Sequence, residues 1–291
     1  MAPQAHLSEG PAAPAPWFFT GQHGRLLYGQ RWEPWPQLHG TAPAPLVLVH
    51  GFAEHIGRYE NLGRAVAASG RTLWAMDLAG FGRSDGPRGI TGPLADVVAD
   101  IGTLVAAATT EERPKPVLVG HSMGGAFAAA YALEHGDQVS ALVLSAPAVH
   151  LAARPKWQVV PAEGLAVIAP RAGLGRIDPA KLSRDPEVAA QFASDPLVWH
   201  GTVPARTAVE MYRAGKLVMK HAGDLSLPVL LLHGEADAIV PVAASRQLYA
   251  ELGSRDKQLR TFGRLYHEVF QEVGKQEVIA VLLEWLGRHK H

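Results

Sequence analysis

Short runs of apolar residues alternate with longer segments of helical periodicity along most of the chain. Apolar runs predict buried strands at residues 46–49, 72–76, 117–119, 141–144 and 229–232, and residues 258–262 are expected to form the last strand. Apolar residues spaced three or four apart predict helices at residues 59–69, 94–108, 123–135, 242–252 and 275–286. Near the N-terminus, two alternating runs at 18–20 and 26–31 flank a Gly-containing turn and predict an antiparallel hairpin. Strands that are apolar on both faces and separated by helices are typical of a mostly parallel sheet covered by helices on both sides.

The segment from His150 to Ala214 breaks this alternation. It contains no clean strand, and its aliphatic and aromatic residues are mixed with several prolines. So long a connection between strands is either an inserted subdomain or disorder, and its apolar content argues against disorder. We therefore predict a mostly helical cap at residues 150–214, inserted into a core formed by residues 1–149 and 215–291. The Ala- and Pro-rich residues 1–15 are expected to be disordered.

Composition narrows the class of protein. Of the 291 residues, 47% are hydrophobic and 19% are charged, as in soluble globular proteins, and the formal net charge is +0. No basic cluster is present, so nucleic acid is not an expected partner. The chain has no cysteine, which excludes disulfides and cysteine-based metal sites. It shows neither a signal peptide nor an apolar run of about 18 residues, so we expect a cytoplasmic protein without a membrane-spanning helix.

The clearest chemical motif is Gly120-His121-Ser122-Met123-Gly124, which follows a predicted strand and precedes a helix of small residues. G-x-S-x-G in this setting is the nucleophile elbow of the α/β-hydrolase fold. The tight turn needs glycine two residues either side of the serine, because a side chain there would collide with neighbouring elements. The N–H of Met123, at the start of the helix, is the first expected donor to an oxyanion. A chance serine in a strand–turn–helix is the simpler alternative, and the sequence context favours the elbow.

A serine nucleophile needs a histidine base, and that histidine needs an acid to orient it. In this fold the chain order is serine, acid, histidine. Asp237 follows the predicted strand 229–232, and His267 follows the last predicted strand. Glu235 is the competing acid, but Asp237 is favoured by its distance past the strand. His233 is interpreted as a structural histidine at the end of its strand.

The loop after residues 46–49 is expected to supply a second oxyanion donor. It begins His50-Gly51-Phe52, where Gly51 lets the backbone turn toward the site. The N–H of Phe52 is the predicted donor. His50 is interpreted as a structural hydrogen-bonding residue and not as a second base.

Four stretches of this chain resemble the monoacylglycerol lipase family. The segment His50–Tyr59 resembles its H-G-x-x-E-H-x-x-R-Y stretch, and Asp77–Ser84 resembles the D-x-x-G-x-G-x-S loop that many α/β-hydrolases share. The elbow matches G-H-S-M-G-G, and His233-Gly234 with Asp237 matches H-G-x-x-D. The discriminating stretch is the first, which contains Glu54 and Arg58. The chain departs from the family's vertebrate members at Phe270, where a polar histidine is expected.

The resemblance implies hydrolysis of monoacylglycerol through an acyl-enzyme, with no metal or organic cofactor. Glu54 and Arg58 could line a polar pocket for glycerol, or form a structural i, i+4 ion pair worth about 0.3–0.5 kcal/mol if exposed. A lysophospholipase or a broad carboxylesterase would use the same triad, and cations in the predicted cap suit a charged head group. A non-catalytic binding protein on the same fold is a third hypothesis. Whether the cap rests on a membrane surface or packs on the core stays open, as does the oligomeric state.

Overall fold

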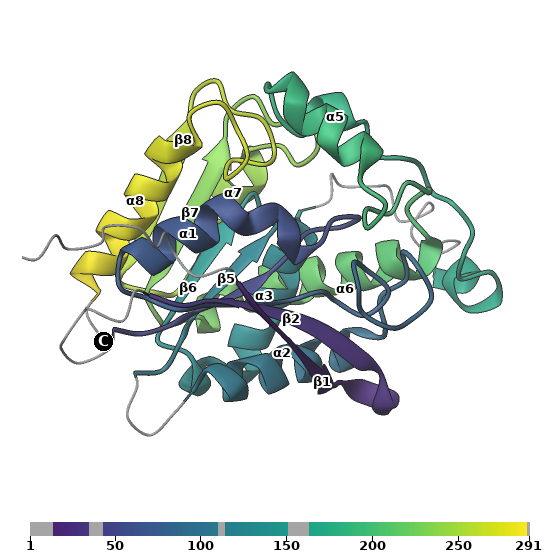
Figure 1. The fold of residues 1–291 in the computed structure, drawn as a ribbon, viewed down its shortest axis with the longest axis horizontal. Helices are drawn as coiled ribbons and strands as arrows, with labels where there is room; N and C mark the ends of the chain where they lie inside the picture. Colours follow the sequence, from purple (N-terminus) through teal and green to yellow (C-terminus); the bar gives the residue numbers. More distant parts are fainter. Residues whose placement is uncertain (1–13, 35–42, 110–113, 151–162, 290–291) are drawn as a thin grey trace, which may run out of the picture.

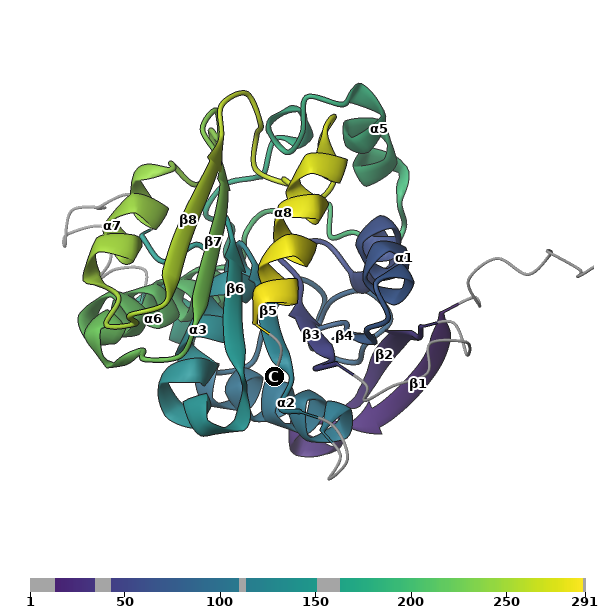
Figure 2. The same ribbon diagram turned by 90° about the vertical axis from the view of Figure 1, so that its left-hand side faces the viewer.

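The computed structural model describes residues 14–34, 43–109, 114–150 and 163–289. A sheet of eight strands forms the centre of the molecule, in the order β1-β2-β4-β3-β5-β6-β7-β8 (Figures 1 and 2). β2 runs antiparallel to both of its neighbours, and the pairs from β4 to β8 are all parallel. The strands are β1 (Ala15–Thr20), β2 (Leu26–Trp32), β3 (Leu46–Val49), β4 (Leu73–Met76), β5 (Val117–His121), β6 (Ala141–Ser145), β7 (Val229–Gly234) and β8 (Lys257–Phe262). This is the predicted α/β-hydrolase fold.

The N-terminal hairpin is also confirmed. Thr20 pairs with Leu26, and the turn between β1 and β2 contains the short 3-10 helix η1 (Gln22–Gly24). The expected disorder extends too far at its C-terminal end, because Ala15 begins β1 and pairs with Arg31. Residues 15–20 pair with β2 along their whole length, and these backbone hydrogen bonds order a segment that its Ala- and Pro-rich surroundings suggested would be disordered. Residues 1–13 lie outside the described part of the chain.

Helices cover both faces of the sheet. Alternate residues of each strand point to opposite faces, so Val47 and Val49 pack on one side of β3 while Leu46 and Leu48 pack on the other. On the first side lie α2 (Leu94–Ala108), α3 (Met123–His135), α6 (Ala205–His221) and α7 (Ala243–Glu251), and on the second lie α1 (Glu60–Ala68) and α8 (Lys275–Arg288). Burial on both faces explains why the central strands read as continuous apolar runs.

In the described part of the predicted cap, helical segments alternate with irregular stretches, and this part lies over the carboxyl ends of the strands (Figures 1 and 2). Residues 163–168 are helical, and η4 (Pro179–Lys181) leads to α5 (Pro186–Ser194), whose N-terminal amide at Glu187 is capped by the Asp185 carboxylate. The predicted boundary at residue 214 falls inside α6, which continues to His221 without a break. The division into core and cap therefore remains a prediction. Residues 151–162 lie outside the described part.

Candidate active site

Ser122 sits on the sharp turn between β5 and α3. Its backbone has φ 52° and ψ −117°, a left-handed conformation that costs energy for a residue with a side chain. The turn is held by two backbone bonds: the N–H of Ser122 donates to the carbonyl of Ser145 at 2.9 Å, and its carbonyl accepts from the N–H of Ala148 at 3.0 Å. One partner is the last residue of β6 and the other lies in the loop just after it, so this strand and its loop hold the elbow in its strained form.

The glycines of the motif are required by close backbone contacts. A Cβ built on Gly120 would lie 2.5 Å from the carbonyl oxygen of Gly124. A Cβ on Gly124 would lie 2.3 Å from the carbonyl oxygens of both Val49 and His50. Real Cβ atoms do not approach oxygen so closely. Because the interior is closely packed, these backbone oxygens have no space into which they could move away. The turn expected from G-x-S-x-G is therefore formed.

The structure brings Ser122, Asp237 and His267 together in one hydrogen-bonded chain. The Nε2 atom of His267 lies 2.8 Å from the Oγ of Ser122, and its Nδ1 lies 2.6 Å from a carboxylate oxygen of Asp237. Because an ionised carboxylate can only accept, Nδ1 carries the proton and Nε2 presents a lone pair to the serine hydroxyl. All three residues are buried. This is the geometry of a Ser-His-Asp triad.

Asp237 is held by four donors. Its second oxygen accepts the N–H groups of Ile239 and Val240 at 2.8 and 2.9 Å, and the Nε2 of His233 lies 3.2 Å from the oxygen that binds His267. Burial alone would raise the pKa of Asp237, but the hydrogen bonds from His233 and His267 outweigh it and hold that pKa well below 3.8. Asp237 thus stays ionised at any working pH.

The structure also shows the contacts of Glu235, the competing acid, and of His233, the other histidine at the end of a strand. Glu235 is exposed, pairs with Arg246 at 3.0 Å, and makes no contact with His267 among the described interactions. His233 is fully buried, and its Nδ1 lies 2.7 Å from the Oγ of Ser245. It is structural, as expected, and it also helps to hold Asp237, which the sequence did not indicate.

The loop after β3 carries the predicted second oxyanion donor. In the described part of the chain, the N–H groups of Phe52 and Met123 donate to no protein acceptor. Ala53 has a positive φ of 71°, and its carbonyl accepts the N–H of Trp199, which lies after α5. His50 accepts the N–H of Leu78 at 2.9 Å, and burial lowers its pKa, so it is neutral and structural, as expected.

Glu54 and Arg58 form a buried ion pair, and a third residue, Glu268, completes it. Arg58 donates both Nη atoms to Glu268 at 2.6 and 2.7 Å, and one of them also reaches Glu54 at 3.2 Å. The other oxygen of Glu54 accepts the Tyr59 hydroxyl at 2.6 Å and the Gly51 N–H at 2.5 Å. The i, i+4 pair is therefore present, but its burial removes the solvent screening assumed for an exposed pair.

Burial and charge act in opposite directions on this cluster. Burial would raise the pKa of Glu54, but nearby His121 and Arg58 hold it below its ordinary value. Burial raises the pKa of Glu268 and, together with the charge of Glu54, outweighs the influence of Arg58. Sequence reasoning missed Glu268, and the one available signal was its position next to His267.

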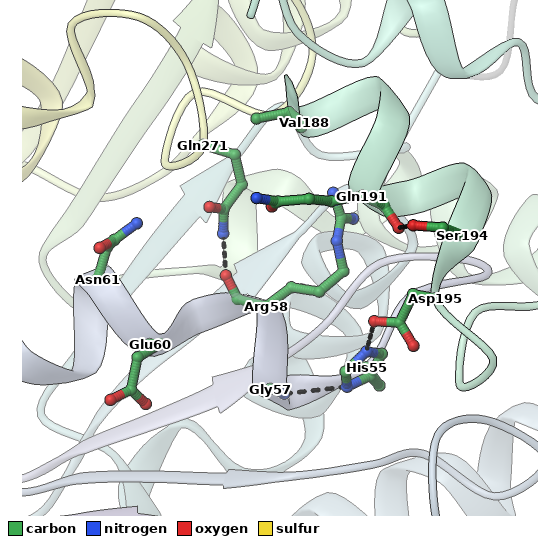
Figure 3. Close-up of a pocket in the computed structure, with 10 residues that line it drawn as sticks. All are labelled: His55, Gly57, Arg58, Glu60, Asn61, Val188, Gln191, Ser194, Asp195 and Gln271. Atoms are coloured by element: carbon green, nitrogen blue, oxygen red, sulfur yellow. Dashed lines mark hydrogen bonds and ion pairs between the residues drawn. The ribbon is translucent and has the colours of Figure 1, made fainter. Parts of the chain in front are cut away.

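A polar pocket of about 430 Å³ lies on the outer side of Arg58, between α1 and α5 (Figure 3). His55 crosses from one wall to the other: its Nδ1 accepts the N–H of Gly57, and its Nε2 lies 2.8 Å from Asp195 at the end of α5. Gln271 donates to the carbonyl of Arg58. None of the triad residues lines this pocket.

His121, inside the elbow, packs beside the catalytic-loop histidine. The ring centroids of His121 and His267 are 4.9 Å apart, and the Nδ1 of His121 lies 3.0 Å from the Oγ of Ser145. Burial, with a further contribution from the charge of His267, lowers the pKa of His121 to about 3. His121 is therefore neutral near pH 7 and adds no positive charge beside the triad.

Comparison with known proteins places this site in a family. The family described as serine aminopeptidase, S33, matches residues 40–274. The chain is 36% identical over 274 residues to a monoacylglycerol lipase of Mycolicibacterium smegmatis, covering 93% of this chain and 96% of that protein. It is 31% identical over 255 residues to the Homo sapiens monoglyceride lipase, covering 86% and 82%. The crystal structure of Paleococcus ferrophilus monoacylglycerol lipase superposes with a TM-score of 0.80 at 31% identity, covering 91% and 99%. The elbow, the fold and these relatives agree, and the chain belongs to the monoacylglycerol lipase family of α/β-hydrolases.

Proposed function

We propose that the protein hydrolyses monoacylglycerol to a fatty acid and glycerol. The observation that carries this proposal is the continuous hydrogen-bonded chain from Asp237 through His267 to Ser122, in a chain whose relatives are named monoacylglycerol lipases. A serine alone is a weak nucleophile near neutral pH, and the adjacent imidazole supplies the base it needs. Because all three groups are present and connected, a non-catalytic binding role has no support in this site.

The geometry leads to a two-step reaction. The Oγ of Ser122 attacks the ester carbonyl while the Nε2 of His267 takes its proton, and Asp237 stabilises the imidazolium that forms. We assign the oxyanion hole to the N–H groups of Phe52 and Met123, which donate to no acceptor within the described residues. His267 then returns the proton to the departing glycerol oxygen, leaving an acyl group on Ser122. Water, activated by the same imidazole, releases the fatty acid in the second step.

The buried cluster behind the site favours a neutral leaving group. Glu54 lies close to the elbow, since a Cβ on Gly51 would be 2.8 Å from its carboxylate and 3.3 Å from the Cβ of Ser122. Arg58 is the cation of this cluster, but Glu54 and Glu268 already bind its Nη groups. The positive charge of Arg58 is therefore already compensated within the cluster, which disfavours phosphate. This supports glycerol over the lysophospholipid alternative.

We also propose that the cap contacts the lipid surface where the substrate resides. Among the helical residues 163–168, Val167 is 77% exposed and Ile168 is 84% exposed. Two large apolar side chains side by side in water are suited to a membrane surface. No helix in the described ranges is long and apolar enough to cross a bilayer. Replacing both residues by serine should reduce co-sedimentation with lipid vesicles while leaving hydrolysis of a soluble ester unchanged, and unchanged co-sedimentation would refute this contact.

A substrate panel tests the main proposal. Purified protein is assayed with monoacylglycerol, diacylglycerol, lysophosphatidylcholine, p-nitrophenyl butyrate and an amino-acid arylamide, with Ser122→Ala as the control. We expect preference for monoacylglycerol and a Ser122→Ala variant that neither turns over substrate nor reacts with a fluorophosphonate probe. Turnover of the activated ester alone would retain the triad and reject the substrate. Fluorophosphonate labelling of Ser122→Ala would reject Ser122 as the nucleophile.

A further inference from the structure

The loop that carries His267 is held by a buried carboxylate, that of Glu272. One oxygen of Glu272 accepts the N–H of Tyr266 at 2.8 Å and the N–H of Arg184 at 3.0 Å. Its other oxygen accepts the N–H of Val273 at 3.0 Å and the Nε of Arg184 at 3.2 Å. The side chain is fully buried, so each of these donors replaces a bond that water would otherwise make. Nothing in the proposed reaction uses this carboxylate.

These bonds hold the backbone on both sides of His267. The N–H before it, on Tyr266, is bound by Glu272, and the N–H after it, on Glu268, donates to the carbonyl of Leu182 at 2.8 Å. Residues 263–274 form neither helix nor strand, so no ladder of secondary-structure bonds fixes their position. The hydrogen bonds of the Tyr266 and Glu268 N–H groups therefore hold the backbone of this loop, as the hydrogen bonds of a sheet hold a strand.

Both interactions reach the segment that leads into α5 of the cap. Leu182 supplies one acceptor, and Arg184 binds Glu272 with its backbone and side chain while its Nη2 donates to the carbonyl of Val273 at 2.9 Å. On the opposite side, the loop meets the acid loop at Gly234, where a Cβ would lie 2.2 Å from the carbonyl oxygen of Tyr266. The loop is thus confined between the cap and β7.

We propose that Glu272 is a positioning residue that sets the reach of His267 toward Ser122, and that Arg184 links this position to the cap. The inference rests on the proposed function, because it takes His267 as the base. Triad contacts of 2.6 and 2.8 Å leave little tolerance, and a displacement of about 1 Å in such a site can cost about 100-fold in rate. Glu272 does not touch the reacting atoms and acts only through the loop.

The chain offers a matched control in Glu210 on α6. Glu210 is also a buried glutamate that accepts one backbone N–H, from Leu94 at 3.0 Å, and binds two arginines at 3.0 and 3.2 Å. It has no described contact with the loops of Ser122, Asp237 or His267. A Glu→Gln change at either position places the NH2 of the new amide opposite an N–H donor, so both variants should lose stability, and Glu272→Gln should lose more because Glu272 accepts three backbone N–H groups. Only the change at Glu272 should move His267.

The test compares Glu272→Gln with Glu210→Gln. We expect a lower Tm in both variants, and in Glu272→Gln alone a kcat lowered by about 10- to 100-fold, measured well below either Tm, with KM within about twofold of wild type. The rate of fluorophosphonate labelling should fall in parallel, since labelling also needs the base. A kcat for Glu272→Gln within twofold of Glu210→Gln would overturn the inference.

Arg184, which is partly exposed, provides a second test if Glu272→Gln does not fold. Arg184→Ala should lower kcat without raising KM, and Arg184→Lys should recover part of the loss, because an ammonium can still pair with Glu272. Equal kcat values for Arg184→Ala and wild type would overturn the link to the cap. A wild type that labels but does not cleave monoacylglycerol would reject the proposed substrate only, and labelling rates would then still decide the role of Glu272.

Discussion

The Gly124→Ala change offers a sharp test of the elbow, because two physical effects predict opposite signs. Gly124 is the second residue of α3, and alanine is favoured over glycine within a helix by about 1 kcal/mol. If helix propensity dominated, the variant would be more stable than wild type. The structure predicts the reverse, because the new Cβ would lie 2.3 Å from the carbonyl oxygens of Val49 and His50.

The magnitude follows from that overlap. Ordinary contacts of a Cβ begin near 3.4 Å, so the helix or the end of β3 must move by about 1 Å. Both opposing atoms are backbone oxygens, at the last residue of β3 and the residue after it, and backbone cannot turn aside as a flexible side chain can. Overpacking of this kind costs about 1–3 kcal/mol. Since His50 leads directly into the loop with the Phe52 N–H, the same movement should lower kcat by about 10- to 100-fold.

Gly102→Ala is the control, because a Cβ at Gly102 in α2 would meet only the ring of Tyr131 at 3.5 Å. That variant should be more stable by about 0.5–1 kcal/mol, with unchanged kcat. Urea unfolding followed by circular dichroism gives the free energies, and turnover of p-nitrophenyl butyrate gives kcat. A Gly124→Ala variant as stable and as active as wild type would refute the reasoning.

Four further predictions concern charge. Asp237→Asn should lower kcat by about 10³- to 10⁴-fold at pH 7, because the amide favours the wrong tautomer of His267; a loss under tenfold in single-turnover assays would contradict this. Because the pKa of Asp237 is lowered in the folded protein, its ionisation stabilises the fold above about pH 4, and this contribution is lost as the pH falls further. Below about pH 4, the urea midpoint of Asp237→Asn should therefore change less with pH than that of wild type. His121 has a pKa of about 3 in the folded protein against 6.5 in the unfolded chain, so the unfolded state binds the proton first as the pH falls. The free energy of unfolding should therefore fall by about 1.4 kcal/mol per pH unit below about pH 6. Urea midpoints at pH 7, 5.5 and 4.5 should show a shallower slope for His121→Gln than for wild type, and an equal slope would argue against a buried neutral histidine. Glu268→Gln removes one of the two carboxylates that bind Arg58. The rate of lysophosphatidate hydrolysis relative to that of monoacylglycerol should then rise at least about fivefold. An unchanged ratio would show that this cluster does not select the head group.

The elements of this protein and the order of its triad follow from local patterns. The elbow is legible in the sequence because its strand, its glycines and its small-residue helix are contiguous, and the collisions that require Gly120 and Gly124 arise within that unit and the adjoining strand. Asp237 and His267 could be assigned because each follows a strand, and the carboxyl ends of parallel strands meet at one edge of a sheet. Periodicity also separated strands from helices, since burial on both faces makes strands continuously apolar.

The contacts that support these groups depend on the tertiary structure. Arg58 and Glu268 are 210 residues apart, and Arg184 and Glu272 are 88 apart, so no local pattern marks either pair. These residues come into contact only because of the strand order and the position of the cap over the sheet (Figure 1). The continuation of α6 past residue 214 has the same origin, because its packing on α3 extends the helix beyond the predicted cap. Backbone preferences act over a few residues, whereas the partner of a buried charge is chosen only when distant segments exclude water together.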